Sequence, residues 1–354
     1  MAAHFHPLTV TRIVRETPDC VSVHFAVPPE LAERFHYAEG QNITLKTTLE
    51  GEEVRRAYSI CKAPYENTLA VAIKKVAGGI FSTFANDTLK AGTVLDVMPP
   101  SGKFNSRPGC TKTYFAVAAG SGITPIISII KEVLHREPES TFTLIYGNRN
   151  RASVIFFEEL AALKNRYINR FNLVHVLSRE HSDTPINNGR IDSGKLSALD
   201  NMLEFTADAH YFVCGPETMI FGVRDFLAAK GIPPAHVHIE LFTNSTKPAS
   251  VRSTTVSDKK IKSRVTLNAD GRSINFDMED AGTTLLDAAL QQGADLPYAC
   301  KGGMCCTCKA RLMEGEVRMD VHWGLEQDEL DKGFILTCQA YPVSEKVVID
   351  FDVR

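Results

Sequence analysis

Four cysteines near the carboxyl end of the chain have the spacing of a metal-cluster site. The gaps between them are four, two and twenty-nine residues, and they are Cys300, Cys305, Cys308 and Cys338. Three thiolates on one loop and a fourth from a distant strand form the arrangement that binds a [2Fe–2S] cluster. Gly302 and Gly303 in this loop allow backbone N–H groups to approach the sulfurs. A structural zinc site is the main alternative, but such sites generally pair two short Cys-x-x-Cys motifs, and one occurs here.

A second group of residues in the first third of the chain suits a nucleotide cofactor. Arg56, Tyr58 and Ser59 combine a phosphate-binding guanidinium, a flat aromatic face and a hydroxyl. Lys74 follows, and then Gly79 and Ser82 open a short predicted helix, whose N-terminus is an anion site suited to a diphosphate. Each motif alone is also compatible with a surface turn, so the prediction depends on their order.

A third group follows predicted parallel strands in the middle of the chain. Gly120, Gly122 and Thr124 lie between a buried strand and a helix, and Thr124 is expected to cap that helix, with Pro125 at its first position. The small residues leave room for a cofactor pyrophosphate. After the fourth parallel strand comes a segment where ligands bind in this architecture: Cys214, Gly215 and Pro216. A buried core cysteine before a turn is the alternative.

Two further strand ends carry candidate residues. Ser178 and Arg179 follow the third parallel strand and are suited to a 2′-phosphate, which favours NADPH over NADH. An ordinary surface arginine is the alternative. Glu240 and Phe242 close the fifth strand, where Phe242 is expected either to cover a flavin ring or to belong to the core.

The elements that must position these residues change character along the chain. Short β-branched runs punctuated by Pro and Gly predict an antiparallel Greek-key β-barrel over residues 1–107. Five buried strands alternating with four helices predict an α/β doubly wound parallel sheet over 108–242. A Ser-, Thr- and Lys-rich linker is expected over 243–262, and a small α+β domain, in which a sheet grasps one helix, over 263–354.

Composition narrows the class of protein. The chain has 354 residues, 44% hydrophobic content and a net charge of -3, which indicates a multidomain globular protein and argues against a nucleic-acid binder. Residues 261–354 contain ten Lys and Arg against sixteen Asp and Glu. This acidic segment is expected either to be simply solvated or to dock on more basic partners.

The sequence also bears on location. The first residues lack the basic and apolar regions of a signal peptide, and the most apolar stretch, residues 114–130, is interrupted by Gly and Pro. Nine cysteines without an export signal suggest a reducing compartment, in which thiols serve metal chemistry. We therefore expect a cytoplasmic protein that does not bind membranes.

Taken together, the motifs and their order resemble the ferredoxin–NADP reductase superfamily with a C-terminal plant-type ferredoxin domain. The likeness covers essentially the whole chain and is greatest to the reductase components of bacterial phenylacetyl-CoA epoxidases. Matching stretches include residues 55–61, 118–125, 144–149, 295–303 and 338–340.

This resemblance implies FAD, with Arg56 and Ser82 near its diphosphate and Tyr58 and Ser59 at the isoalloxazine. It implies a nicotinamide beside Cys214, with the dinucleotide near Gly120 and Thr124. The chemistry is then expected to involve Ser59, Cys214 and Glu240, with the four cysteines as [2Fe–2S] ligands. Cys306 departs from the family pattern, which has a small non-thiol residue there.

The implied function is electron transfer from NADPH or NADH through FAD and the [2Fe–2S] cluster. The implied acceptor is the di-iron oxygenase of phenylacetyl-CoA epoxidase, in phenylacetate degradation. Two alternatives stay open: a reductase for a ring-hydroxylating dioxygenase or another monooxygenase, and a non-catalytic electron carrier. The residues alone do not distinguish them, because no readable motif marks the docking surface.

Overall fold

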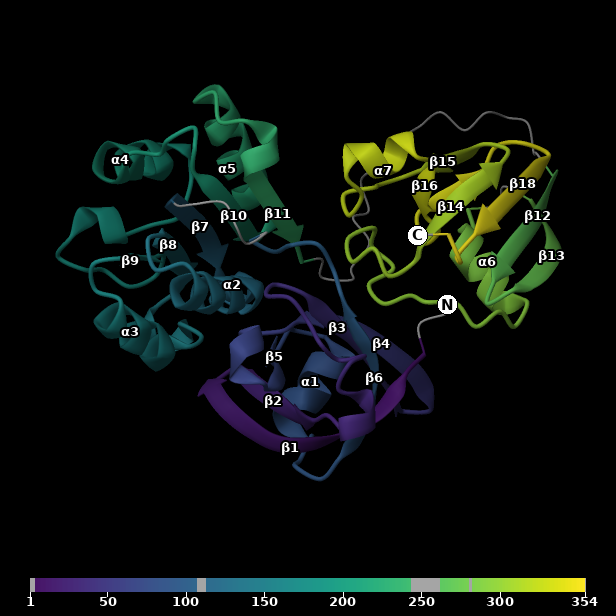
Figure 1. Cartoon of the computed structure of the whole chain (residues 1–354), viewed down its shortest axis with the longest axis horizontal. Helices are drawn as coiled ribbons and strands as arrows, with labels where there is room; N and C mark the ends of the chain where they lie inside the picture. Colours follow the sequence, from purple (N-terminus) through teal and green to yellow (C-terminus); the bar gives the residue numbers. More distant parts are fainter. Residues whose placement is uncertain (1–3, 107–112, 243–261, 280–281, 354) are drawn as a thin grey trace. The chain divides into compact units, whose positions relative to one another are not determined.

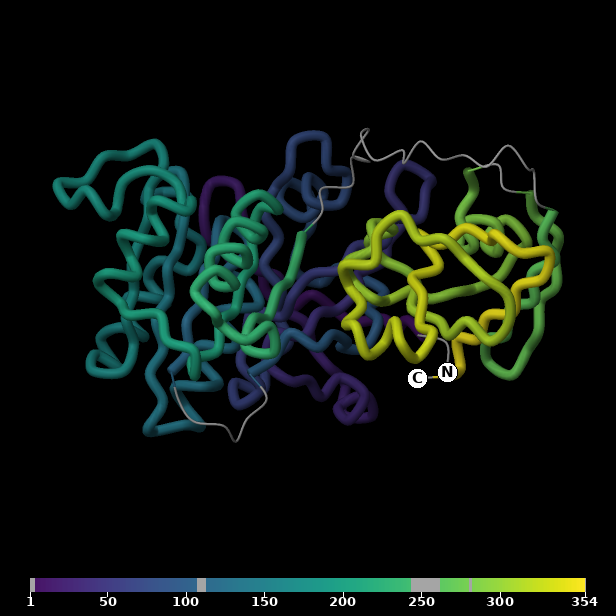
Figure 2. Tube along the Cα trace, turned by 90° about the horizontal axis from the view of Figure 1, so that it is seen from above, coloured from purple at the N-terminus to yellow at the C-terminus, as the bar shows by residue number. Residues whose placement is uncertain are grey.

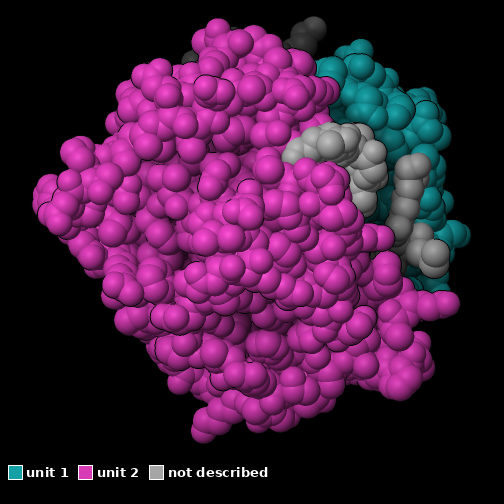
Figure 3. Space-filling view, turned by 60° about the vertical axis from the view of Figure 1, so that its left-hand side comes forward, with its two compact units in different colours: residues 1–5, 55–57, 243–354 teal, residues 6–54, 58–242 magenta. Residues whose placement is uncertain are grey.

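The computed structural model describes residues 4–106, 113–242, 262–279 and 282–353. The chain separates into two compact units, which are residues 6–54 with 58–242, and residues 1–5 and 55–57 with 243–354 (Figure 3). The predicted linker at 243–262 lies, except for its last residue, outside the described residues. The expected domain boundaries stay predictions.

The first sheet is antiparallel and has the strand order β4-β3-β6-β1-β2-β5. Its strands are β1 (His6–Thr17), β2 (Cys20–Ala26), β3 (Asn42–Leu49), β4 (Glu52–Ser59), β5 (Leu69–Lys74) and β6 (Val94–Ser101). Alternating apolar residues such as Leu8, Val10 and Val23 point into one core, and α1 (Ile80–Asp87) adds Phe81 to it. The expected antiparallel barrel is confirmed, with α1 beside its strands (Figure 1).

The second sheet is parallel and has the strand order β11-β10-β7-β8-β9. Its strands are β7 (Thr113–Ala119), β8 (Thr141–Asn148), β9 (Phe171–Leu177), β10 (His210–Gly215) and β11 (Val237–Leu241). Its helices are α2 (Ile123–Arg136), α3 (Phe157–Arg166), α4 (Ser193–Leu203) and α5 (Glu217–Ala229). The order, with β7 at the centre, is that of a doubly wound sheet, as predicted.

Both faces of the parallel sheet are buried. Alternate residues of β7, Tyr114 and Ala116, pack with α2 and α3, whereas Phe115 and Val117 pack with α4 and α5. Figure 1 shows the two helix pairs on opposite sides of the strands. Such two-sided burial explains why these strands are almost continuously apolar in sequence.

The third domain is a small mixed sheet that holds one helix. Its strand order is β13-β12-β18-β14-β16, with β15 and β17 forming a separate pair. The strands are β12 (Lys262–Ala269), β13 (Arg272–Glu279), β14 (Lys309–Glu314), β15 (Val317–Met319), β16 (Phe334–Leu336), β17 (Ala340–Pro342) and β18 (Lys346–Asp350). The helices are α6 (Leu285–Gln291) and α7 (Gln327–Asp331), and Figure 2 shows these elements gathered in one body. The expected β-grasp architecture is confirmed.

One local prediction is wrong. The helix α2 begins at Ile123, so Thr124 lies inside its first turn and is not the cap. A 3₁₀ turn over Gly120–Gly122 joins the helix directly and moves its start towards the strand, while the Thr124 hydroxyl donates to the Ser121 carbonyl at 3.1 Å.

Among the described helices, none is long and apolar enough to cross a membrane.

Candidate functional site: a nucleotide cleft and a cysteine loop

The carboxyl ends of β7 and β10 meet at a close approach that only glycine permits. A Cβ atom on Gly122 would lie 2.1 Å from the carbonyl oxygen of Cys214, and one on Gly215 would lie 3.2 Å from the backbone nitrogen of Ala119. Gly120 has a φ of +54°, and the Tyr146 hydroxyl donates to its carbonyl at 2.9 Å. The strand ends and the start of α2 are therefore held in one arrangement, with Pro216 preceding α5.

The three residues expected to carry the chemistry are brought together. Cys214 on β10 is paired in register with Glu240 on β11. The Ser59 hydroxyl, at the end of β4, donates to Glu240 Oε2 at 3.2 Å. Residues 181 positions apart in sequence thus meet where the antiparallel barrel adjoins the parallel sheet.

Desolvation determines the protonation of this group. It raises the pKa of Glu240 to about 8, although the hydrogen bond from Ser59 opposes the shift. Burial, with the nearby Glu240, also raises the pKa of Cys214 well above its usual value. Near neutral pH the site therefore presents a neutral carboxylic acid and a neutral thiol, and Glu240 holds a proton whose release would leave a desolvated carboxylate.

The barrel residues line up along two neighbouring elements. Tyr58 lies beside α1, with its ring 5.6 Å from that of Phe81. Arg56 is on the same strand, β4, and its guanidinium donates to the Arg55 carbonyl at 2.7 Å. The structure thus places an aromatic face near the helix whose N-terminus was predicted to bind a diphosphate.

The entry to α1 is a tight turn. Gly79 caps the helix, and the Ser82 hydroxyl accepts from the Val76 backbone N–H at 3.1 Å and donates to the Gly79 carbonyl at 3.2 Å. A Cβ on Gly79 would lie 2.5 Å from that hydroxyl. Ser82 therefore shapes the turn, which leaves the first N–H groups of the helix to meet an anion.

Lys74, the last residue of the barrel strand β5, lies close to the Gly120–Gly122 turn. Its ammonium group lies 3.6 Å from Asp19 Oδ2 and 3.8 Å from the position of a Cβ on Gly120. A cation at this position faces the same space as the small residues after β7. The arrangement is suited to a phosphate group.

The ends of β8 and β9 add a residue that the sequence reasoning did not single out. Asn148 is 8% exposed, and neither atom of its amide has a hydrogen-bond partner among the described residues. A buried amide without partners is costly unless a ligand satisfies it. Ser178 and Arg179 are exposed and follow β9, where their backbone N–H groups donate to Asn148 and Arg149. The buried polar amide fits a bound dinucleotide at these strand ends.

A cavity of about 740 Å³ opens between the barrel and the parallel sheet. It is lined by Arg15, Glu16, Arg151, Ala152, Val154, Phe156, Phe157, Glu158, Glu159 and Glu180. The predicted cofactor residues are not among these, although Glu180 follows Arg179 directly. Arg151 stacks on Phe157 at 4.6 Å, and no short motif in the sequence marks this pair. Phe242, 37% exposed, ends the described part of the parallel-sheet domain.

The four predicted cluster ligands come together as two pairs. Side-chain hydrogen bonds join Cys300 to Cys305, and Cys308 to Cys338. In the described parts of the chain, no three His, Cys, Asp or Glu side chains are grouped to hold a single metal ion. Two adjacent thiol pairs fit a cluster with two irons, each of which takes two protein sulfurs.

The loop around these thiols supplies backbone donors. The N–H of Gly302 points at Cys300 Sγ at 3.3 Å, and the Thr307 hydroxyl lies 3.2 Å from Cys305 Sγ. Gly303 has a φ of +75°, and a Cβ there would lie 2.7 Å from the Val321 side chain. Such donors stabilise negative charge on cluster sulfurs, so these residues fit a [2Fe–2S] group.

Cys306 does not join either pair. Its backbone is left-handed, with a φ of 54°, and its thiol donates to the Gly324 carbonyl. The Cys306 side chain therefore points to the segment around Gly324, which packs on the loop. This hydrogen bond gives Cys306 a role in holding the loop, in place of the small residue that the family pattern has there.

Comparison with known proteins agrees with this arrangement. Three family models match: an oxidoreductase FAD-binding domain over residues 7–106, an oxidoreductase NAD-binding domain over 116–225, and a 2Fe-2S iron-sulfur cluster binding domain over 267–343. One subunit of the 1,2-phenylacetyl-CoA epoxidase of Escherichia coli (strain K12) is 42% identical over 99% of this chain and 98% of its own length. The chain belongs to this family of oxygenase reductase components.

More distant relatives share the organisation. The ferredoxin reductase component of the 3-ketosteroid-9-alpha-monooxygenase of Rhodococcus rhodochrous is 34% identical over 97% of this chain and 96% of its own length. The structure of phthalate dioxygenase reductase matches with a TM-score of 0.61 and 23% identity, covering 98% of each chain. The chain is thus a flavoprotein oxidoreductase with FAD-binding, NAD-binding and [2Fe–2S] domains.

Replacing Glu240 by Gln should remove a pH dependence of stability. The unfolded carboxyl ionises above about pH 4.3, whereas the folded one stays protonated to about pH 8. The wild-type protein should therefore lose about 1.4 kcal/mol of stability per pH unit between roughly pH 5 and pH 8. Calorimetric melting across this range should show that loss in the wild type and in Glu158→Gln, an exposed control, but not in Glu240→Gln. Parallel pH profiles for all three would contradict the assignment.

Replacing Cys306 by Ser should leave the cluster intact, because a hydroxyl can still donate to the Gly324 carbonyl. Iron and sulfide content and the visible spectrum of the purified protein should match those of the wild type. Cys308→Ser is the matched control and should lose the cluster. Cluster loss in Cys306→Ser would mean that the ligand set is wrong.

Proposed function

We propose that the chain is the reductase component of a phenylacetyl-CoA epoxidase. It would take electrons from NADPH, or NADH, and deliver them to the di-iron oxygenase of that complex in phenylacetate degradation. The observation that carries this proposal is the 42% identity to the Escherichia coli epoxidase component along nearly the full length of both chains. All eight cysteines in the described residues are free thiols, which supports a reducing, cytoplasmic location.

The site geometry supports specific roles. When bound, FAD supplies hydride acceptance with release of single electrons, and the [2Fe–2S] cluster passes these on one at a time. Arg56, Lys74, Gly79 and Ser82 would hold the FAD diphosphate, and Tyr58 would lie against its ring system. The hydroxyl of Ser59 would orient the reacting end of the flavin.

The parallel sheet would hold the nicotinamide nucleotide. Gly120, Gly122 and Thr124 leave space for its pyrophosphate, and Cys214, with Gly215 and Pro216, would border the nicotinamide. Glu240 would hold or move a proton beside the flavin through Ser59, which its raised pKa of about 8 allows. Phe242 would cover the ring in the absence of nucleotide, and Cys300, Cys305, Cys308 and Cys338 would ligate the cluster.

A second acceptor is supported by a specific observation. Two reductase components of other oxygenases, a 3-ketosteroid-9-alpha-monooxygenase and a glycine betaine monooxygenase, match over at least 97% of this chain. The same reductase organisation therefore serves different oxygenases. A carrier role without catalysis has no comparable support.

Reconstitution tests the acceptor. The purified chain, loaded with FAD and cluster, should support NADPH-dependent formation of the ring epoxide of phenylacetyl-CoA when mixed with the di-iron oxygenase components of the epoxidase. A Rieske oxygenase with its own substrate is the matched comparison and should show no coupled turnover. Coupling to the Rieske enzyme alone would contradict the proposed partner while leaving the reductase chemistry intact.

Arg179→Ala tests the nucleotide preference. Loss of a guanidinium beside a 2′-phosphate should raise the KM for NADPH about tenfold and leave the KM for NADH within about twofold. Steady-state cytochrome c reduction with each nucleotide measures both values. Arg166→Ala, an exposed arginine near the end of α3, is the control. Equal increases for both nucleotides would remove the 2′-phosphate role.

A further inference from the structure

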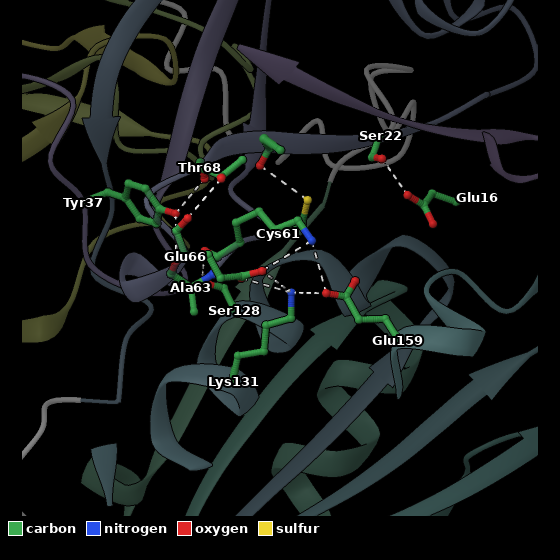
Figure 4. A network of polar contacts seen from close by, with 12 residues as sticks. Glu16, Ser22, Tyr37, Cys61, Ala63, Glu66, Thr68, Ser128, Lys131 and Glu159 are labelled. Atoms are coloured by element: carbon green, nitrogen blue, oxygen red, sulfur yellow. Dashed lines mark hydrogen bonds and ion pairs between the residues drawn. The ribbon is translucent and has the colours of Figure 1, made fainter. Parts of the chain in front are cut away.

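A buried ionic network joins the antiparallel barrel to two helices of the nucleotide domain (Figure 4). At its centre is Lys131 of α2, whose side chain is 3% exposed. Its ammonium group lies 3.1 Å from Glu66, which follows the barrel strand β4, and it also pairs with Glu159 of α3. A buried cation is tolerated only with such close partners.

Lys62 is the second cation of the network and pairs with the same two carboxylates as Lys131. It lies 3.1 Å from Glu159 and 3.5 Å from Glu66, so two ammonium groups alternate with two carboxylates. Burial would raise the pKa of Glu159, but attraction to Lys131 and Lys62 outweighs it and lowers the pKa below its usual value. The Ser128 hydroxyl adds a hydrogen bond to the Lys62 carbonyl at 2.7 Å. Glu159 therefore keeps its charge at neutral pH, between the two ammonium groups with which it pairs.

Both chain segments of the network lead directly into the candidate site. Lys62 comes three residues after Ser59, which donates to Glu240. Lys131 lies about two helical turns, roughly 10 Å, from Thr124 at the start of α2. A shift of α2 against the barrel would therefore move the Gly120–Gly122 turn relative to Ser59.

We propose that Lys131 is a positioning residue for hydride transfer, because it sets the start of α2, and with it the nucleotide, against the flavin side of the barrel. This inference rests on the proposed transfer from NAD(P)H to FAD and is independent of which oxygenase accepts the electrons. Hydride transfer is steep in distance, and a displacement of about 1 Å is enough to cost on the order of 100-fold in rate.

The test replaces Lys131 by Met in the full-length, FAD-loaded protein. Anaerobic stopped-flow mixing with NADPH or NADH should show a limiting rate of flavin reduction at least tenfold below the wild type, with the nucleotide Kd within about twofold. The nicotinamide–flavin charge-transfer absorbance should weaken. Independently of any flavin chemistry, hydrogen exchange of the backbone over residues 118–126 should become faster. Lys131→Arg should restore most of the rate, because it keeps a cation between the two carboxylates.

Two further variants separate positioning from general stability. Lys230→Met removes an ion pair with Asp200 between α4 and α5 and should lower the melting temperature without changing the limiting rate or the charge-transfer band. Ser128→Ala removes the hydrogen bond to the Lys62 carbonyl and leaves every charge of the network paired. It should reduce the rate by about fivefold, less than Lys131→Met does. This variant keeps the test available if Lys131→Met does not fold. Unchanged exchange over residues 118–126 in a folded Lys131→Met, or a limiting rate equal to that of Lys230→Met, would overturn the inference. Failure of the wild type itself to be reduced by either nucleotide would instead reject the proposed function.

Discussion

The hydrogen bond between Ser59 and the desolvated carboxyl of Glu240 requires a barrel strand and a sheet strand to end at the same point. Ser59 belongs to β4, and Glu240 belongs to the last strand of the parallel sheet. Because desolvation disfavours the charged form of the Glu240 carboxyl, a hydrogen-bond partner stabilises it, and that partner comes from the other domain. The proposed redox site has the same requirement, since the flavin and nicotinamide rings would have to meet where these strands end.

Contacts around this site fix the ends of β4 and β11 next to each other. Gly122 allows the start of α2 to touch the carbonyl of Cys214, so the Gly120–Gly122 turn packs directly on the end of β10. Further along α2, Lys131 pairs with Glu66 of the barrel, and Glu159 of α3 pairs with Lys62, which also follows β4. Buried ion pairs contribute little net stability compared with apolar packing, but they are strongly directional. Their presence here fits a need for defined geometry more than a need for stability.

The cysteine loop is organised by different means. Three of the four cysteines lie within nine residues, so much of the site is local, and left-handed backbone at Lys301, Gly303 and Cys306 folds the loop around them. Only Cys338 comes from a distant segment. Its position depends on the small mixed sheet, in which Thr337 donates to the Cys308 carbonyl at 2.9 Å. The thiol of Cys306 donates a hydrogen bond to the Gly324 carbonyl and so links the cysteine loop to the segment that packs on it.

The sequence by itself determined the three domain architectures and the family, because these depend on periodicity and on the order of short motifs, and the Cys-x-x-Cys spacing predicts which four cysteines would ligate the cluster. It did not determine where α2 begins, since the 3₁₀ turn before Ile123 depends on packing of Gly122 against β10. Nor did it indicate Asn148, whose significance is that burial leaves its amide without a partner among the described residues. The Lys131 network and the protonated Glu240 also became visible only in three dimensions. Charge pairing and desolvation act between side chains that are far apart in sequence, and no local pattern records such distances.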